Sequence, residues 1–336
     1  MKKRNFFSWL FVPIFIINIF IIFPLSGYAA EITLKLGHVT PNGSHHDIAA
    51  KKLSERLLAN TGGRVEIKVY GNAQFGSPPE HWAQLKSGAI DLFCFDLGGV
   101  SMIENKPKNF NVTKAAYIFD GQEGWMKFLK SDLFKEMMGK TEKNHGIKYA
   151  GYLGRSGIMG ISTTNKRIVV PEDLKGVKIR VPGEPIFVST YEGWGATPTP
   201  IHPKDIYTSL KTGLVDGLNM YFDQIYTQKW YEIEKYFTML DWNQSGVGCW
   251  MNGKKWASLP DDVQKAFAKS AEETSRYIWE YIDSTTKKAK EVLPENGVEI
   301  IYPDLAPWKT IAKKVAMEQD GKMWEKGLYD KVRATQ

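Results

Sequence analysis

The chain has 336 residues, a formal net charge of +7, two cysteines and a hydrophobic fraction of 43%. Two cysteines exclude a disulfide-stapled scaffold, and the basic residues are scattered among acidic ones, which argues against the basic stripe of a nucleic-acid-binding protein. A chain of this length is near the size at which one hydrophobic core divides into two.

The first thirty residues predict export. Three basic residues precede an apolar run over 6–25, and small residues follow over 26–30. Cleavage after Ala29 fits this pattern, because cleavage one residue later would place Tyr28 where a small side chain is needed. We therefore expect a signal peptide over 1–29 and a periplasmic protein. An uncleaved anchor is the alternative, since the run approaches the roughly 20 residues that span a bilayer.

Strand and helix patterns alternate through the first hundred residues. Residues 31–39 and 64–70 show strand alternation, while 46–59 and 79–87 have helical periodicity. The apolar run 89–97 is typical of a parallel strand that is buried on both faces. This order predicts an α/β fold with a doubly wound open sheet.

The same order of elements restarts after about residue 150. We expect strands over 158–163, 177–181 and 244–251 and a short strand after 217, with helices over 186–192 and 203–212. A second α/β unit is therefore predicted.

A long helix follows. Ser258 is a candidate N-cap, Pro260 suits the first turn, and no helix breaker intervenes before Pro294. A helix of that length is expected to bridge two lobes.

Cys94 and Cys249 lie in apolar, strand-like runs. Buried free thiols are the simpler interpretation, and a disulfide between them stays open because export permits one.

Motifs of catalysis and metal binding are weak. The chain has no nucleophile elbow, no P-loop and no zinc-protease helix motif. The run His45, His46 and Asp47 invites a metal site, but surface or capping roles are the more economical interpretation. We expect a protein that is not an enzyme, with no cofactor and no metal.

An arginine on a short strand points to ligand binding. Residues 177–181 alternate, with Val177, Ile179 and Val181 on one face and Arg180 on the other. The planar guanidinium suits two parallel hydrogen bonds to a carboxylate. An exposed arginine paired with a surface acid is the alternative for this segment alone.

Eight short motifs occur in a fixed order along almost the whole chain after the leader. Together they resemble the DctP-type solute-binding proteins of tripartite ATP-independent periplasmic (TRAP) transporters. The motifs are LKLGHVT at 34–40, TGGRV at 61–65, QFG at 74–76, TTNKRI at 163–168, PEDLKGVKIR at 171–180, GATPTP at 195–200, LKTGLVDG at 210–217 and YEIEKY at 231–236.

The resemblance implies two α/β lobes of the periplasmic-binding-protein fold, with a ligand cleft between them and a long helix crossing both. We expect lobe I over 30–157 plus about 246–285, and lobe II over 158–245 plus about 286–336. The implied partners are a small organic acid and the membrane subunits of a TRAP permease, and we expect a monomer.

Site residues carry over by position. Arg180 matches the family arginine that grips the ligand carboxylate, and Asp96 matches a polar or acidic cleft position. Val39 falls at a cleft-lining position, and His38 beside it is placed to hydrogen-bond a ligand. The family asparagine aligns with Met220, so Asn219 stands one place early.

The position of a second family arginine is occupied by Gly160, which indicates a larger site with one arginine. The aromatic residues near the cleft segments, Trp194, Tyr221 and Trp242, then favour a monocarboxylate with a bulky or apolar part. A binding protein of an ATP-driven importer, a sensor, or a protein for a neutral ligand remain the alternatives.

Overall fold

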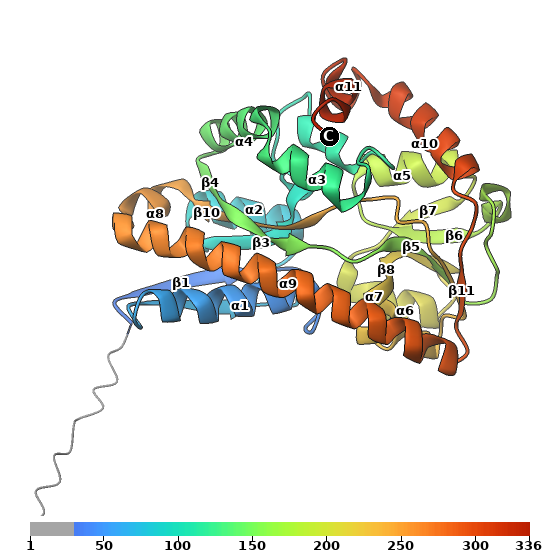
Figure 1. Ribbon diagram of the computed structural model, residues 1–336, viewed down its shortest axis with the longest axis horizontal. Helices are drawn as coiled ribbons and strands as arrows, with labels where there is room; N and C mark the ends of the chain where they lie inside the picture. Colours follow the sequence, from blue (N-terminus) through green and yellow to red (C-terminus); the bar gives the residue numbers. More distant parts are fainter. Residues whose placement is uncertain (1–29) are drawn as a thin grey trace, which may run out of the picture.

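The computed structural model describes residues 30–336 as two lobes, each built on one β-sheet (Figure 1). The predicted signal peptide, residues 1–29, lies outside this part of the chain. Within residues 30–336, no helix combines the length and the apolar character that a membrane crossing requires.

The sheet of the first lobe has the strand order β2-β1-β3-β10-β4. Strand β1 pairs in parallel with β2 and β3, whereas β10 runs antiparallel to β3 and β4, so the sheet is mixed rather than wholly parallel. Its strands are β1 (Ile32–Gly37), β2 (Val65–Tyr70), β3 (Leu92–Asp96), β4 (Ile147–Arg155) and β10 (Gly246–Asn252). Its helices are α1 (His45–Asn60), α2 (Pro78–Ser87), α3 (Gly121–Lys130), α4 (Asp132–His145) and α8 (Gly253–Ser258).

The sheet of the second lobe has the order β11-β9-β5-β8-β6-β7, and β5 runs antiparallel to both of its neighbours. The strands are β5 (Met159–Thr163), β6 (Lys178–Val181), β7 (Thr197–Pro200), β8 (Gly217–Tyr221), β9 (Tyr236–Thr238) and β11 (Glu299–Ile301). The later helices are α5 (Pro185–Gly193), α6 (Ile206–Lys211), α7 (Phe222–Thr227), α10 (Ala306–Gln319) and α11 (Leu328–Arg333).

Helix α9 (Asp261–Glu295) crosses both lobes, as predicted (Figure 1). Phe267 and Ile278 pack in the core of the first sheet, while Ala289 and Leu293 pack in a core of the second. The predicted cap is wrong. Ser258 ends α8 and donates its hydroxyl to the Lys255 carbonyl oxygen at 2.7 Å, so the helix starts after Pro260.

The lobe boundaries within the chain stay a prediction. The C-terminal segment makes contacts beyond the second sheet, because Arg333 on α11 donates to the Ile118 carbonyl oxygen at 3.0 Å. Arg333 also pairs with Asp120 at 2.9 Å, so the end of the chain lies against the first lobe.

Cys94 on β3 and Cys249 on β10 are directly opposite one another in the antiparallel register. Both are buried free thiols, as the simpler interpretation expected. Burial raises the pKa of the Cys94 thiol.

We expect Gly154→Ala to destabilise the fold by about 2–4 kcal/mol, because it combines backbone strain with overpacking. Gly154 has a φ of 122°, and a Cβ there would lie 2.5 Å from the Ile278 Cβ on α9. Gly62 has a φ of 61° with nothing within 4 Å, so Gly62→Ala adds backbone strain without overpacking. Equal losses for the two variants in urea unfolding would contradict this account of the contact between β4 and α9.

Candidate functional site

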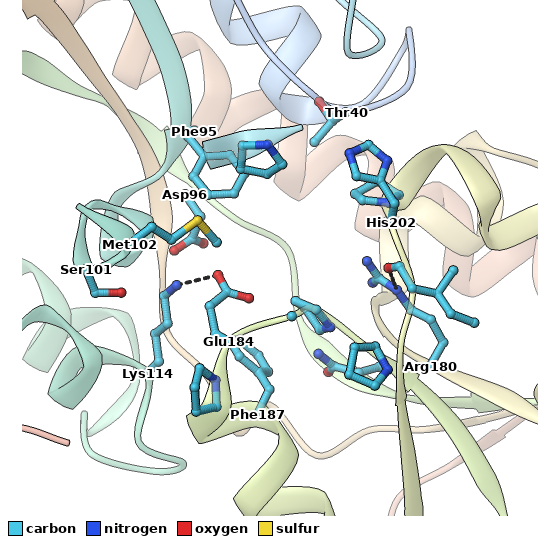
Figure 2. Close-up of a pocket in the computed structure, with 18 of the residues that line it drawn as sticks. Thr40, Phe95, Asp96, Ser101, Met102, Lys114, Arg180, Glu184, Phe187 and His202 are labelled. Atoms are coloured by element: carbon cyan, nitrogen blue, oxygen red, sulfur yellow. Dashed lines mark hydrogen bonds and ion pairs between the residues drawn. The ribbon is translucent and has the colours of Figure 1, made fainter. Parts of the chain in front are cut away.

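A cavity of about 910 Å³ is lined by residues of both lobes (Figure 2). The first lobe supplies the end of β3, the segment after it, and the start of α1. The second lobe supplies β6, the loop before α5, β8 and the start of α7. The lining side chains used below are Thr40, His46, Phe95, Asp96, Met102, Lys114, Met159, Arg180, Glu184, Phe187, His202, Ile206, Asn219, Met220, Tyr221, Gln224 and Trp230.

Arg180 is the central charged group on the second-lobe side. Ile179 and Val181 are buried in the core on the opposite face of β6, so strand alternation turns Arg180 toward the cavity. The residue is only 4% exposed, and its Nε donates to the Ile201 carbonyl oxygen at 3.0 Å. Within residues 30–336, no carboxylate oxygen lies within 4.0 Å of its guanidinium nitrogens.

Burial lowers the pKa of Arg180 to about 10, but the group remains a cation at neutral pH. A buried charge without a counter-ion is costly. The arrangement is therefore suited to an anion that enters from the cavity.

Asn219 on the neighbouring strand adds a second donor. The Tyr191 hydroxyl donates to Asn219 Oδ1 at 3.1 Å, which orients the amide and leaves its Nδ2 as the free end. Asn219 is 2% exposed, and its Nδ2 has no hydrogen-bond partner among the described residues. Arg180 and Leu218 are paired in the parallel register of β6 and β8, so Asn219 lies one residue further along.

The opposite side of the cavity holds an ion pair that joins the lobes. Lys114 ends a 3₁₀ helix (Asn109–Lys114) of the first lobe, and Glu184 immediately precedes α5 of the second. The Lys114 Nζ and Glu184 Oε1 are 2.6 Å apart, with side chains 3% and 7% exposed. Figure 2 shows this pair and Asp96 across the cavity from Arg180.

Asp96 stands at the end of β3 and accepts a hydrogen bond from the Gly98 backbone N–H at 3.1 Å. Burial raises the pKa of its carboxyl, which the charge of Lys114 opposes. The segment that follows Asp96 packs closely against Lys114, since a Cβ on Gly98 would lie 2.7 Å from the Lys114 side chain. The polar groups of this side therefore come from three separate parts of the chain.

His45 and His46 are buried, so the predicted surface role is wrong. The Gln224 amide donates to His45 Nδ1 at 3.0 Å across the lobe boundary. His46 lines the cavity, and neither of its ring nitrogens has a partner among the described residues. Within residues 30–336 no group of three histidine, cysteine, aspartate or glutamate side chains could hold a metal ion.

These histidines predict a pH dependence. Burial lowers the pKa of His45 to about 3 and takes the pKa of His46 well below 6.5, so the folded protein holds both rings neutral. The unfolded chain takes up these protons below about pH 6.5, and the histidines therefore reduce stability progressively as pH falls toward 3.

We expect the melting temperature of the double variant His45→Asn/His46→Asn to fall less than that of the wild type when the pH is lowered from about 7.5 to about 5. Asp223 and Glu234, whose pKa values burial raises to about 7 and about 8, act with the opposite sign. They are shared by both proteins, so the difference between the two pH profiles isolates the histidines. Identical profiles would contradict this assignment.

Five of the ten predicted site residues line the cavity: Asp96, Arg180, Asn219, Met220 and Tyr221. The Tyr221 hydroxyl lies 3.0 Å from Ser245 Oγ, and its ring packs edge-on against His45. The structure thus brings these five together from β3, β6 and β8.

His38 and Val39 do not line the cavity. The His38 ring lies 3.2 Å from the Asp47 carboxylate and 3.2 Å from the Thr40 hydroxyl, and both ring nitrogens are occupied by these contacts. Val39 is fully buried in a core cluster with Trp82. The side chains of His38 and Val39 thus both point into the protein interior. Thr40 is the residue of this segment that lines the cavity.

Gly160, Trp194 and Trp242 also lie outside the lining. A Cβ on Gly160 would meet the Thr238 carbonyl oxygen at 2.4 Å and the Phe237 ring, so this glycine opens no volume for a ligand. Trp194 donates its Nε1 to the Trp308 carbonyl oxygen and packs edge-on against Trp242. The two tryptophans form a layer behind the cavity wall.

Several lining residues were missed, above all Lys114, Glu184, Phe187 and His46. Phe187 is an aromatic residue that reaches the cavity, and it packs edge-on against Trp242 with ring centroids 5.3 Å apart. The adjacent histidines were a signal for His46, but Lys114 ends a short 3₁₀ helix and Glu184 stands just before α5, and neither position carries a periodic pattern.

Residues 36–322 match the model of a family described as bacterial extracellular solute-binding protein, family 7. The chain belongs to this family. Its members and structural neighbours are binding proteins of the TRAP type, with the two-lobed fold described above. Expectations from the sequence about family and fold are thereby confirmed.

Three relatives illustrate the match. The 2,3-diketo-L-gulonate-binding periplasmic protein of Escherichia coli is 24% identical over 83% of this chain and 83% of its own. A TRAP solute-binding protein of Actinobacillus succinogenes with bound L-galactonate is 25% identical, with a TM-score of 0.82 over 90% of this chain and 98% of its own. A TRAP solute-binding protein of Sulfurospirillum deleyianum with bound succinate is 22% identical, with a TM-score of 0.82 over 91% of this chain and 100% of its own.

Proposed function

We propose that this solute-binding protein captures a small organic acid in the periplasm and delivers it to a TRAP-type permease. The observation that carries the proposal is Arg180, a buried cation at the cavity wall with no carboxylate partner within residues 30–336. A ligand carboxylate there would accept from the guanidinium, and Asn219 Nδ2 would donate to it as well.

The ligand is a monocarboxylate with a bulky part. Among the lining cations of residues 30–336, Arg180 is buried without an ion-pair partner, whereas Lys114 is already paired with Glu184 and Lys106, Lys108 and Lys322 are less buried. Part of the second-lobe wall is apolar, and Met159, Ile206, Met220 and Trp230 contribute to it. A volume of about 910 Å³ is far larger than a two- or three-carbon acid needs. Two relatives named above bind hydroxylated monocarboxylates, whereas a third holds a dicarboxylate.

The protein acts as a monomeric carrier, not an enzyme. Its cavity lies between two lobes that four connections join: the chain from β4 to β5, the chain from β9 to β10, helix α9, and the C-terminal segment from α10 to α11. Hinge closure over such a cavity buries a ligand and excludes water, which strengthens its polar contacts. Release then requires only that the lobes open at the permease.

A thermal-shift screen of monocarboxylates, each paired with its methyl ester, tests the proposal. A bound acid raises the melting temperature according to how far its concentration exceeds its dissociation constant. We expect acids, but not their esters, to stabilise the protein, with calorimetry confirming one site. Equal stabilisation by acid and ester, or by neither, would contradict carboxylate capture.

A further inference from the structure

We propose that Asp96, Lys114 and Glu184 form a second subsite that binds an uncharged group able to donate and to accept a hydrogen bond. A hydroxyl or a carboxamide at the far end of the acid has this chemistry. The inference rests on the proposed function, because it assumes that the carboxylate of the same ligand is held by Arg180.

Glu184 supplies the acceptor. Its Oε1 is taken by the Lys114 ammonium at 2.6 Å, but its Oε2 has no partner among the described residues and is buried at the cavity wall. A buried carboxylate oxygen without a donor is unfavourable, and a ligand O–H or N–H directed at it would satisfy it.

Lys114 supplies the donor. An ammonium group has three N–H bonds, and one of these is used by Glu184. The lysine is 2% exposed and its side chain packs closely against Gly98, so burial and the bond to Glu184 keep the ammonium at the cavity wall. A ligand oxygen beside Glu184 Oε2 can therefore accept from the same lysine that Glu184 binds.

The charges of the subsite select a neutral group. Two carboxyl side chains, Asp96 and Glu184, lie around one ammonium, so a second ligand carboxylate meets repulsion. A ligand ammonium would instead be placed beside Lys114. Burial raises the pKa of Asp96, which agrees with an environment that disfavours further negative charge. Hydroxyl and carboxamide groups avoid both conflicts.

The far-end group also has to lie across the cavity from Arg180. Figure 2 shows Glu184, Lys114 and Asp96 on one side of the cavity and Arg180 with His202 on the other. Met102 and Phe187 flank the subsite and give the connecting part of the ligand an apolar surface. The two polar ends thus set both the orientation and the length of the ligand.

Straight-chain acids of four to eight carbons test this proposal by calorimetry. At each length the far end is a methyl, a hydroxyl, a carboxamide or a second carboxylate group. At the best length we expect the hydroxyl or carboxamide acid to bind at least tenfold tighter than the methyl acid and the dicarboxylate. Comparing the two neutral groups shows which of them the subsite prefers.

The variant Glu184→Met tests whether the preference for a hydroxyl or carboxamide end arises at this subsite. Any loss of lobe closure weakens all of the acids together, so the ratio of dissociation constants for hydroxyl and methyl acids reports on the subsite alone. We expect that ratio to fall to within threefold of one in Glu184→Met. In Asp96→Asn, which keeps the size and removes the charge, binding of the dicarboxylate should improve relative to the methyl acid.

The experiments distinguish failure of the subsite from failure of the proposed function. Methyl acids that bind as tightly as hydroxyl and carboxamide acids, or a preference that persists in Glu184→Met, would overturn the subsite while leaving carboxylate capture intact. Acids that bind no better than their methyl esters would overturn the proposed function, and the subsite with it.

Discussion

Arg180→Met lowers the affinity for a bound acid by roughly 10- to 150-fold, because hydrogen bonds to charged groups contribute about 1.5–3 kcal/mol. Methionine keeps an unbranched side chain of similar reach but offers neither charge nor donors. Arg180→Lys retains the charge and loses the planar fork, so its affinity should fall between those of the wild type and the methionine variant. Calorimetry with the best acid from the thermal-shift screen measures all three proteins.

The same substitution leaves the free protein close to its original stability. The guanidinium is buried without a direct ion pair, so its replacement by an apolar side chain relieves a desolvation cost while it removes one bond to Ile201 and the longer-range attraction of Glu184. Arg167→Met is the matched control, because Arg167 forms an exposed pair with Glu299 on the second lobe. A clear loss of stability in Arg180→Met with unchanged affinity would show that Arg180 is structural.

Lys114→Met lowers the affinity for every acid, including those with a methyl end, by roughly 100-fold or more. Closure in this variant buries Glu184 without its partner, and breaking a buried ion pair by removing one member costs about 3–5 kcal/mol. The two residues belong to different lobes, so opening of the cleft lets water reach Glu184. We therefore expect the cost in ligand affinity rather than in the free energy of unfolding.

The double variant Lys114→Met/Glu184→Met separates the effect of the ion pair from the effect of leaving one buried partner unpaired. Apolar replacement of both partners of a buried pair is often neutral, so affinity for the methyl acids should recover most of the loss. Lys140→Met is the control, since Lys140 pairs with Glu136 at the surface of α4 and an exposed pair contributes little. Strictly additive losses in the double variant would contradict the role of this pair in closure.

Much of the fold was predictable because its strands and helices carry strong periodic patterns. The alternation over β6 was enough to predict that Arg180 faces away from Ile179 and Val181. The long uninterrupted pattern after Pro260 was enough to predict α9. The start of α9 was missed because Ser258 also suits the end of a short helix, and α8 uses it in that way.

The candidate site was predictable only in part, because a strand pattern gives the face of a side chain but not what packs against it. Trp194 and Trp242 lie close in sequence to cleft segments, yet they pack on each other, and Trp194 also packs on Trp308. Lys114 and Glu184 are 70 positions apart in the chain, and no local pattern relates them. Tertiary packing alone brings them to one side of the cavity.

A crystal structure of the protein with its tightest-binding acid tests the central claim most directly. We expect the ligand carboxylate within hydrogen-bond distance of the terminal nitrogens of Arg180, at about 2.7–2.9 Å, and close to Asn219 Nδ2. A carboxylate bound elsewhere, with the Arg180 guanidinium touching only protein or solvent, would contradict it.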